Sequence, residues 1–221
     1  MDKSVYTSLV LGSTGLVGDM LTRNLLESNC YSTVYAISRS PLKYTHPKLI
    51  NIIGDYQSID QQIIHLKVDH FYCCIGSTRK KTPQLEQYYE IDHDYPYKIC
   101  KLLKNNGLHK TCIISSMGAN ANSTGFYLKM KGELERDIVE LNISDTFILR
   151  PSLLLGKRDE IRGLELFSSY IMGIANLFLI GGLKNYRSIQ ASDVASAMQK
   201  IVTSSLTGLH IIQSEKIKQL A

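Results

Sequence analysis

The chain has 221 residues, of which 44% are hydrophobic and 20% charged, a composition typical of a folded globular protein with enough apolar material for a core. Its 25 basic and 20 acidic side chains give a net charge of +5. Because this excess is small and the basic residues are scattered along the chain, the composition argues against nucleic-acid binding.

Short apolar runs alternate with amphipathic stretches over the first two thirds of the chain. Strands are expected over 8–11, 33–38, 49–53, 70–75, 111–115 and 145–149, and helices over 17–28, 59–65, 86–105 and 128–141. This alternation predicts an α/β fold, a doubly wound parallel sheet of Rossmann type with helices on both faces. We expect one nucleotide-binding domain over 1–221, in which residues 151–221 complete the sheet and form a small C-terminal cap on the substrate side.

The first expected strand runs into a loop with glycines at every third position, in the segment LVLGSTGLVGDML. Glycines there permit a tight turn and a close approach of ligand and backbone, and the free N–H groups at the following helix start favour a pyrophosphate. The strand–loop–helix context predicts a dinucleotide-binding loop, and a plain turn is the alternative. The expected loop residues are Gly12, Ser13, Thr14, Gly15, Leu16, Val17 and Gly18.

The end of the second expected strand distinguishes between the two nicotinamide dinucleotides. An acidic side chain at this point would bind the ribose hydroxyls of NAD, whereas this chain reads AISRSPLK, with Arg39 and Ser40 at the tip. A guanidinium forms forked hydrogen bonds with a phosphate. The sequence therefore favours NADP(H), and a solvated surface arginine is the alternative.

The third and fourth expected strands also end in polar residues. Asp55 and Tyr56 follow the third strand, where a carboxylate would face the adenine amine. Gly76, Ser77 and Thr78 follow the fourth, and we expect them to pass beneath the ribose on the nicotinamide side.

A tyrosine and a lysine four residues apart, Tyr127 and Lys131, follow the fifth expected strand and its ISSMGA ending. On a helix they share one face, and an ammonium nearby favours the phenolate, which makes tyrosine a more effective proton donor. A serine hydroxyl from the strand end would orient a substrate carbonyl. Two other pairs have the same spacing, Tyr44/Lys48, which spans Pro47, and Tyr97/Lys101, which no serine-ended strand immediately precedes.

Other chemistry is less well supported. The six histidines have no metal-ligand spacing, so no metal site is expected, and the serines lack the G-x-S-x-G pattern of a hydrolase. Asp92 and Asp193 would either support the cofactor loops or cap helices.

Two features bear on the cellular location of the protein and on its contact with membranes. Five cysteines form no CxxC pair and no secretory pattern opens the chain, so we expect a reducing, cytoplasmic location. Residues 166–183, LFSSYIMGIANLFLIGGL, carry no charge, and we expect a buried or pocket-lining helix, with peripheral membrane contact or a membrane span as alternatives. A protein partner and a homodimer are both compatible with the sequence.

The order of LGSTGLVG, SRS, GDY, CCIGSTR, ISSMGA, YLKMK and LRPSLLLG resembles the atypical short-chain dehydrogenase/reductases. The resemblance covers roughly residues 5–200 and is most specific in FYCCIGSTRKK and SSMGAN…FYLKMKGELE, where it is similar to the group around the human HIV Tat-interacting oxidoreductase. It implies a Rossmann-type fold that binds NADPH, with Gly12, Gly15 and Gly18 in the phosphate loop and Arg39 at the 2′-phosphate position.

The same resemblance implies the roles of the remaining site residues. Tyr127 and Lys131 match the catalytic pair, and Ser116 is the preferred match for the catalytic serine, with the adjacent Ser115 as the alternative. Pro151 and Ser152 match the segment that passes the nicotinamide carboxamide. The function implied is an NADPH-dependent oxidoreductase acting on a small carbonyl substrate, and the alternative is a non-catalytic NADPH-binding sensor that acts through a protein partner.

Overall fold

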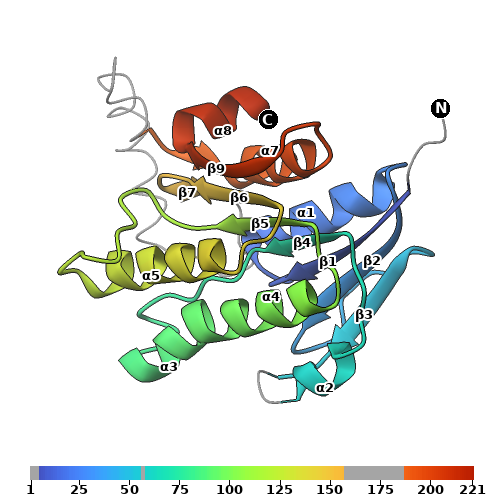
Figure 1. The fold of residues 1–221 in the computed structure, drawn as a ribbon, viewed down its shortest axis with the longest axis horizontal. Helices are drawn as coiled ribbons and strands as arrows, with labels where there is room; N and C mark the ends of the chain where they lie inside the picture. Colours follow the sequence, from blue (N-terminus) through green and yellow to red (C-terminus); the bar gives the residue numbers. More distant parts are fainter. Residues whose placement is uncertain (1–4, 56–57, 157–186) are drawn as a thin grey trace.

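A seven-stranded parallel sheet forms the centre of the molecule (Figure 1). The computed structural model describes residues 5–55, 58–156 and 187–221. The strands are β1 (Tyr6–Leu11), β2 (Tyr31–Ser38), β3 (Leu49–Ile53), β4 (His70–Cys73), β5 (Lys110–Ile114), β6 (Asp145–Arg150) and β9 (Gly208–Gln213). Their order, β3-β2-β1-β4-β5-β6-β9, reverses direction between β1 and β4, and ligands of such sheets bind at that point, beyond the carboxyl ends of the strands.

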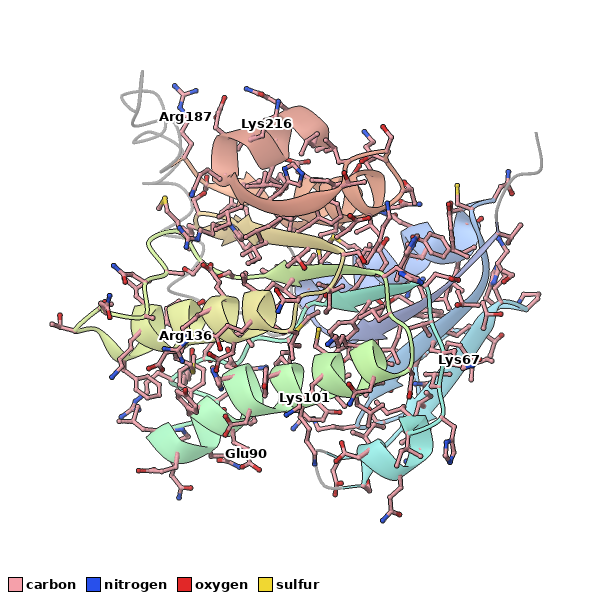
Figure 2. The ribbon with its side chains drawn as sticks, viewed as in Figure 1. Lys67, Glu90, Lys101, Arg136, Arg187 and Lys216 are labelled. Atoms are coloured by element: carbon pink, nitrogen blue, oxygen red, sulfur yellow. The ribbon has the colours of Figure 1, made fainter. Side chains whose placement is uncertain are left out.

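Helices cover both faces of this sheet, so the predicted doubly wound arrangement is confirmed. One face packs against α1 (Leu16–Glu27), α7 (Ala191–Val202) and α8 (Ser214–Leu220). The other packs against α2 (Ile59–Ile63), α4 (Tyr95–Asn105) and α5 (Phe126–Glu140). Charged side chains such as Lys101 on α4 and Arg136 on α5 project outward from these layers (Figure 2).

The two hydrophobic cores follow from the alternation of side chains along each strand. In β1, Leu9 and Leu11 pack toward α2, α4 and α5, whereas Val10 between them packs toward α1 and α7. All three are almost completely buried. The central strands are thus apolar on both faces, which is why they read as continuous apolar runs in the sequence.

The helical stretch expected over 86–105 is continuous but not uniform. It consists of α3 (Leu85–Tyr89), a π-helical turn η1 (Glu90–Asp94) and α4. A π turn carries an additional residue in the helix and is frequent at functional sites. The fourth strand is shorter than expected and ends at Cys73, although the N–H of Cys74 still donates a hydrogen bond to the Leu11 carbonyl (2.8 Å).

The last third of the chain adds β9 beside β6, followed by α8, and a two-stranded sheet of β7 (Leu154–Leu155) and β8 (Ile189–Gln190). Residues 157–186 of this expected cap region, including 166–183, lie outside the described residues. Within the described part of the chain, no helix is long and apolar enough to cross a membrane. The single-domain division and the membrane contact stay predictions.

A buried polar cluster lies at the edge of the sheet opposite the carboxyl ends of the strands. The Tyr31 hydroxyl, at the start of β2, lies 2.8 Å from Nδ1 of His70 and 2.7 Å from the hydroxyl of Tyr72. Burial, which disfavours the charged imidazolium, lowers the pKa of His70 from 6.5 to about 4. The cluster is therefore built around a neutral imidazole.

This cluster predicts a loss of stability in mild acid. Because the folded protein binds the His70 proton less readily than the unfolded chain, its contribution is complete above about pH 6.5 and is lost as the pH falls toward 4, by about 3 kcal/mol in total. Urea unfolding should show the free energy of unfolding of the wild type decreasing more steeply over this interval than that of His70→Asn. Parallel pH profiles of the two proteins would contradict the assignment.

Candidate active site

The turn between β1 and α1 is formed by backbone groups in direct contact. Gly12 has a φ of +85°, and a Cβ added to it would lie 2.9 Å from the backbone of Cys74 and Ile75, which follow β4. A Cβ on Gly18 would lie 2.1 Å from the Gly12 carbonyl oxygen, far inside any van der Waals distance. Only glycine fits at either position, so the first turn of α1 packs directly on the loop.

The N-terminus of α1 has the properties of an anion-binding site. Gly15 stands at its N-cap, where no side chain caps the helix, and the first N–H groups of a helix have no partner within it. Thr14 is exposed on the same loop, whereas Ser13 is buried and donates a hydrogen bond from its hydroxyl to the Ile37 carbonyl (2.8 Å). The Ser13 side chain therefore holds the loop against β2, and its contribution to a ligand is limited to the backbone.

Beyond β2, the chain makes a hydrogen-bonded turn that exposes Arg39 and Ser40. The Ser38 hydroxyl donates to the Ser40 carbonyl (2.7 Å) and accepts from the Asn51 amide (2.8 Å). This turn places Arg39 directly after β2, at the same carboxyl edge of the sheet as the glycine loop.

The polar residues after β3 and β4 are held by local hydrogen bonds. Asp55 Oδ1 accepts from the N–H (2.9 Å) and the hydroxyl (2.7 Å) of Ser58, just before α2, and Tyr56 lies outside the described residues. Ser77, in the loop that begins at Gly76, donates its N–H to Asp92 Oδ1 (2.7 Å). The loop is closed by Thr82, whose N–H donates to the Thr78 carbonyl (2.9 Å).

Tyr127 and Lys131 lie one turn apart on α5, as the sequence predicts. The tyrosine is 39% exposed, and its ring stacks on that of Tyr88 at a centroid distance of 6.4 Å. The lysine side chain is only 3% exposed, and its Nζ lies 3.2 Å from Oδ2 of the fully buried Asp92. Burial alone would lower the pKa of Lys131, but the charges of Asp92 and Tyr127 outweigh it, so this pKa lies above its ordinary value.

The two adjacent serines after β5 have different surroundings. Ser115 is buried, and its hydroxyl donates to Glu135 Oε1 on α5. That carboxylate also accepts two hydrogen bonds from Arg150 at the end of β6, at Oε1 (2.9 Å) and Oε2 (2.5 Å). Ser116 is only half-buried, with one long contact of 3.4 Å to the Met117 carbonyl. Its hydroxyl is the one that a ligand can engage.

The segment after β6 is tied to its neighbours. The buried Pro151 accepts a hydrogen bond at its carbonyl from the Met117 N–H (3.1 Å), which brings it beside the segment that follows β5. The Ser152 hydroxyl lies 2.9 Å from the Ser214 hydroxyl and also donates to the Arg187 carbonyl. Like Ser13, Ser152 uses its side chain within the protein.

The sequence left Asp92 open between support of a cofactor loop and a helix cap. Asp92 lies within a continuous helical run rather than at a cap, and it accepts the Ser77 N–H from the loop after β4. The Glu135–Arg150 pair and the Tyr88 ring were missed, although Glu135 repeats the four-residue spacing of Tyr127 and Lys131. Asp193 lies in the first turn of α7, after the cap residue Gln190. Among the described residues, no group of three or more possible metal ligands occurs.

The sequence matches proteins of known families over most of its length. Residues 8–211 match the NAD dependent epimerase/dehydratase family. Protein FMP52, mitochondrial, from Candida glabrata is 38% identical over 161 residues, 72% of this chain and 69% of the relative. The protein of the same name from Candida albicans is 33% identical over 211 residues, 91% of this chain and 90% of the relative.

Solved structures share the fold at low sequence identity. The Bordetella bronchiseptica enzyme WbmH in complex with NAD+ superposes with a TM-score of 0.73 at 15% identity, covering 97% of this chain and 79% of that one. MoeE5 in complex with UDP-glucose and NAD gives a TM-score of 0.69 at 17% identity, covering 96% and 79%. These likenesses establish the fold.

The names of the relatives correct one prediction. The cytoplasmic location expected from the sequence is wrong, because the FMP52 proteins are named mitochondrial. Reduced cysteines and the lack of a secretory pattern do not distinguish the cytosol from a mitochondrial compartment. The narrower resemblance to the Tat-interacting group stays a prediction.

The contact between Gly18 and Gly12 predicts a large effect of one methyl group. Gly18→Ala should lower the free energy of unfolding by roughly 1–3 kcal/mol, because its Cβ must displace the backbone of the loop. Gly125→Ala is the matched control, since a Cβ there meets only the Ser123 hydroxyl at 3.7 Å. Denaturant unfolding of the three proteins measures this difference, and an unaltered stability of Gly18→Ala would refute the close packing.

Proposed function

The chain belongs to the NAD dependent epimerase/dehydratase family, and on this premise we propose that it is an oxidoreductase that uses NADPH to reduce the carbonyl group of a small molecule. One observation carries the proposal: the glycine loop and the Tyr127–Lys131 pair lie at the same carboxyl edge of one sheet. The names of the relatives further support a mitochondrial location.

The residues at this edge fit a nicotinamide dinucleotide. The backbone turn at Gly12 and Gly18 has no room for a Cβ, and α1 starts without a side-chain cap. Both features suit a pyrophosphate. WbmH and MoeE5, which share the fold, are described with NAD. In this chain, the exposed Arg39 takes the place of an acidic residue at the end of β2 and favours the additional phosphate of NADP(H).

The remaining cofactor contacts come from the loops after the other strands. Asp55 would face the adenine, the backbone of residues 76–78 would pass along the ribose on the nicotinamide side, and Pro151 would lie beside the carboxamide. When bound, the nicotinamide supplies a hydride to the substrate carbon. The residues of the chain then have to bind the substrate oxygen and provide a proton.

Three side chains are suited to this task. Ser116, whose hydroxyl is not bound to Glu135, would hold the carbonyl oxygen as it gains negative charge. Tyr127 would donate its phenolic proton to that oxygen, and its 39% exposure leaves a path for solvent to return the proton. Lys131 would stabilise the phenolate and bind the ribose hydroxyls.

The choice of cofactor is tested by Arg39→Ala. Loss of one charge-assisted contact to a phosphate should weaken NADPH binding roughly 10- to 100-fold and leave NADH binding within about twofold. Nucleotide fluorescence titration of both cofactors measures the change. Lys43→Ala, on the same exposed stretch, is the control. An equal loss for both nucleotides would argue against a role in reading the phosphate.

The role of Tyr127 is tested by removing only its hydroxyl. On a carbonyl compound reduced by the wild type, Tyr127→Phe should lower kcat by about 10²- to 10⁴-fold while NADPH affinity changes less than about threefold. Tyr97→Phe, from the other helical Tyr/Lys pair, should retain full activity. Undiminished turnover by Tyr127→Phe would contradict the mechanism, and NADPH binding without any turnover by the wild type would favour the sensor alternative.

A further inference from the structure

The loop after β4 carries positive charge at the carboxyl edge of the sheet. Arg79, Lys80 and Lys81 follow one another there, and all three are exposed. This is the loop whose backbone, at residues 76–78, the proposed function places along the ribose on the nicotinamide side. Arg79 is therefore the first charged side chain after the backbone that would meet the nicotinamide end of the cofactor.

Hydrogen bonds hold this loop in a closed turn. The N–H groups of Lys81 and Thr82 both donate to the Thr78 carbonyl, each at 2.9 Å. The hydroxyl of the buried Thr82 also lies 2.5 Å from the Ser77 hydroxyl. Arg79 lies within this turn, so the fold fixes the point from which its long side chain starts.

Tyr88 connects the turn to the residue proposed to donate the proton. Its hydroxyl lies 3.4 Å from the Ser77 carbonyl oxygen, and its ring stacks on that of Tyr127 at a centroid distance of 6.4 Å. Burial raises the pKa of Tyr88 to about 12, and the Arg79 charge, which acts in the opposite direction, is near enough to affect this hydroxyl. Arg79 and Tyr127 thus lie beside the same buried ring.

Two other cations near the reacting groups already have carboxylate partners. Lys131 Nζ lies 3.2 Å from Asp92 Oδ2, and Arg150 donates two hydrogen bonds to Glu135. Arg79, in contrast, forms no ion pair with any residue that the structure describes. Its exposed charge is therefore available to a ligand at this edge of the sheet.

We propose that Arg79 binds a carboxylate of the substrate, so that the small molecule reduced at this site is a carbonyl compound with an acidic group. A guanidinium can form two parallel hydrogen bonds with a carboxylate, which fix orientation as well as distance. The acid would be held at the turn after β4 while the carbonyl group reaches Ser116 and Tyr127. This inference rests on the proposed function, since it names the class of substrate for the same site.

The test compares two ketones that differ in charge but hardly in shape, 4-acetylbenzoate and 4-acetylbenzamide. Their reduction by the wild type is followed through the oxidation of NADPH. A charge-assisted pair is worth roughly 10- to 100-fold, so kcat/KM for the benzoate should exceed that for the benzamide by at least about tenfold. The corresponding 3-acetyl isomers, measured in parallel, vary the separation between the ketone and the acid.

Arg79→Gln removes the charge and keeps a polar side chain. It should lower kcat/KM for the benzoate roughly 10- to 100-fold, while kcat/KM for the benzamide and the dissociation constant of NADPH change less than about twofold. Lys80→Gln, the same change at the next exposed residue, is the matched control and should retain the preference for the benzoate.

Three results would overturn the proposal. The first is equal kcat/KM of the wild type for the charged and neutral ketones, and the second is a preference for the benzoate that survives Arg79→Gln. The third is a loss of NADPH affinity in Arg79→Gln that accounts for its lower activity on both ketones, because the partner of Arg79 would then be a phosphate of the cofactor.

Calorimetry decides the question if neither ketone is reduced. The acetylbenzoate is titrated into the wild type and into Arg79→Gln, both saturated with NADP+, which cannot reduce it. Binding that Arg79→Gln weakens by at least about tenfold, and that the benzamide does not show, would support the proposal. No binding, or equal binding by the two proteins, would overturn it.

The nucleotide titration separates this inference from the function on which it rests. If the wild type bound neither nucleotide, the proposed function would fail, and titration of the acetylbenzoate into the nucleotide-free protein would still show whether Arg79 binds a carboxylate. If the wild type bound NADPH and reduced both ketones equally well, the proposed function would stand and the inference alone would fail.

Discussion

The site depends on a contact between backbone atoms rather than between side chains. The Gly12 turn lies against the backbone of residues 74–75 and beneath the first turn of α1, with no room for a Cβ at Gly12 or Gly18. This contact fixes where the chain leaves β4. The Ser77 N–H therefore meets Asp92, and Asp92 meets Lys131. The phosphate loop and the candidate catalytic helix are connected by this short series of contacts.

A second property of the site is the division of its hydroxyl groups between fold and function. The Ser13 side chain holds the glycine loop to β2. The Ser115 side chain holds the end of β5 to α5, and the Ser152 side chain holds the end of β6 to α8. Thr14, Ser116 and Tyr127 are more exposed, and the proposed function assigns Ser116 and Tyr127 to the substrate. Several polar residues at the carboxyl edge thus maintain its shape.

The sequence predicted the features that depend on local pattern. The apolar runs located the first six strands of the sheet, and the spacing of Gly12, Gly15 and Gly18 located the loop. The position of Tyr127 after a hydroxyl-ended strand separated it from Tyr44 and Tyr97. Asp92 was ambiguous because a carboxylate near a helix start resembles a cap, and only tertiary contacts show that it lies in a π turn. Ser115 and Ser116 are adjacent, so their different surroundings depend on how β5 meets α5 and β6.

The pairing of Arg150 with Glu135 ties the end of β6 to helix α5. Arg150 is the last residue of β6, and its guanidinium is bonded to the helix that carries Tyr127 and Lys131. A forked pair of hydrogen bonds fixes orientation as well as distance, so α5 cannot turn about its own axis without breaking this pair. The direction in which α5 presents Tyr127 is therefore set by an ion pair about two helical turns further along the same helix.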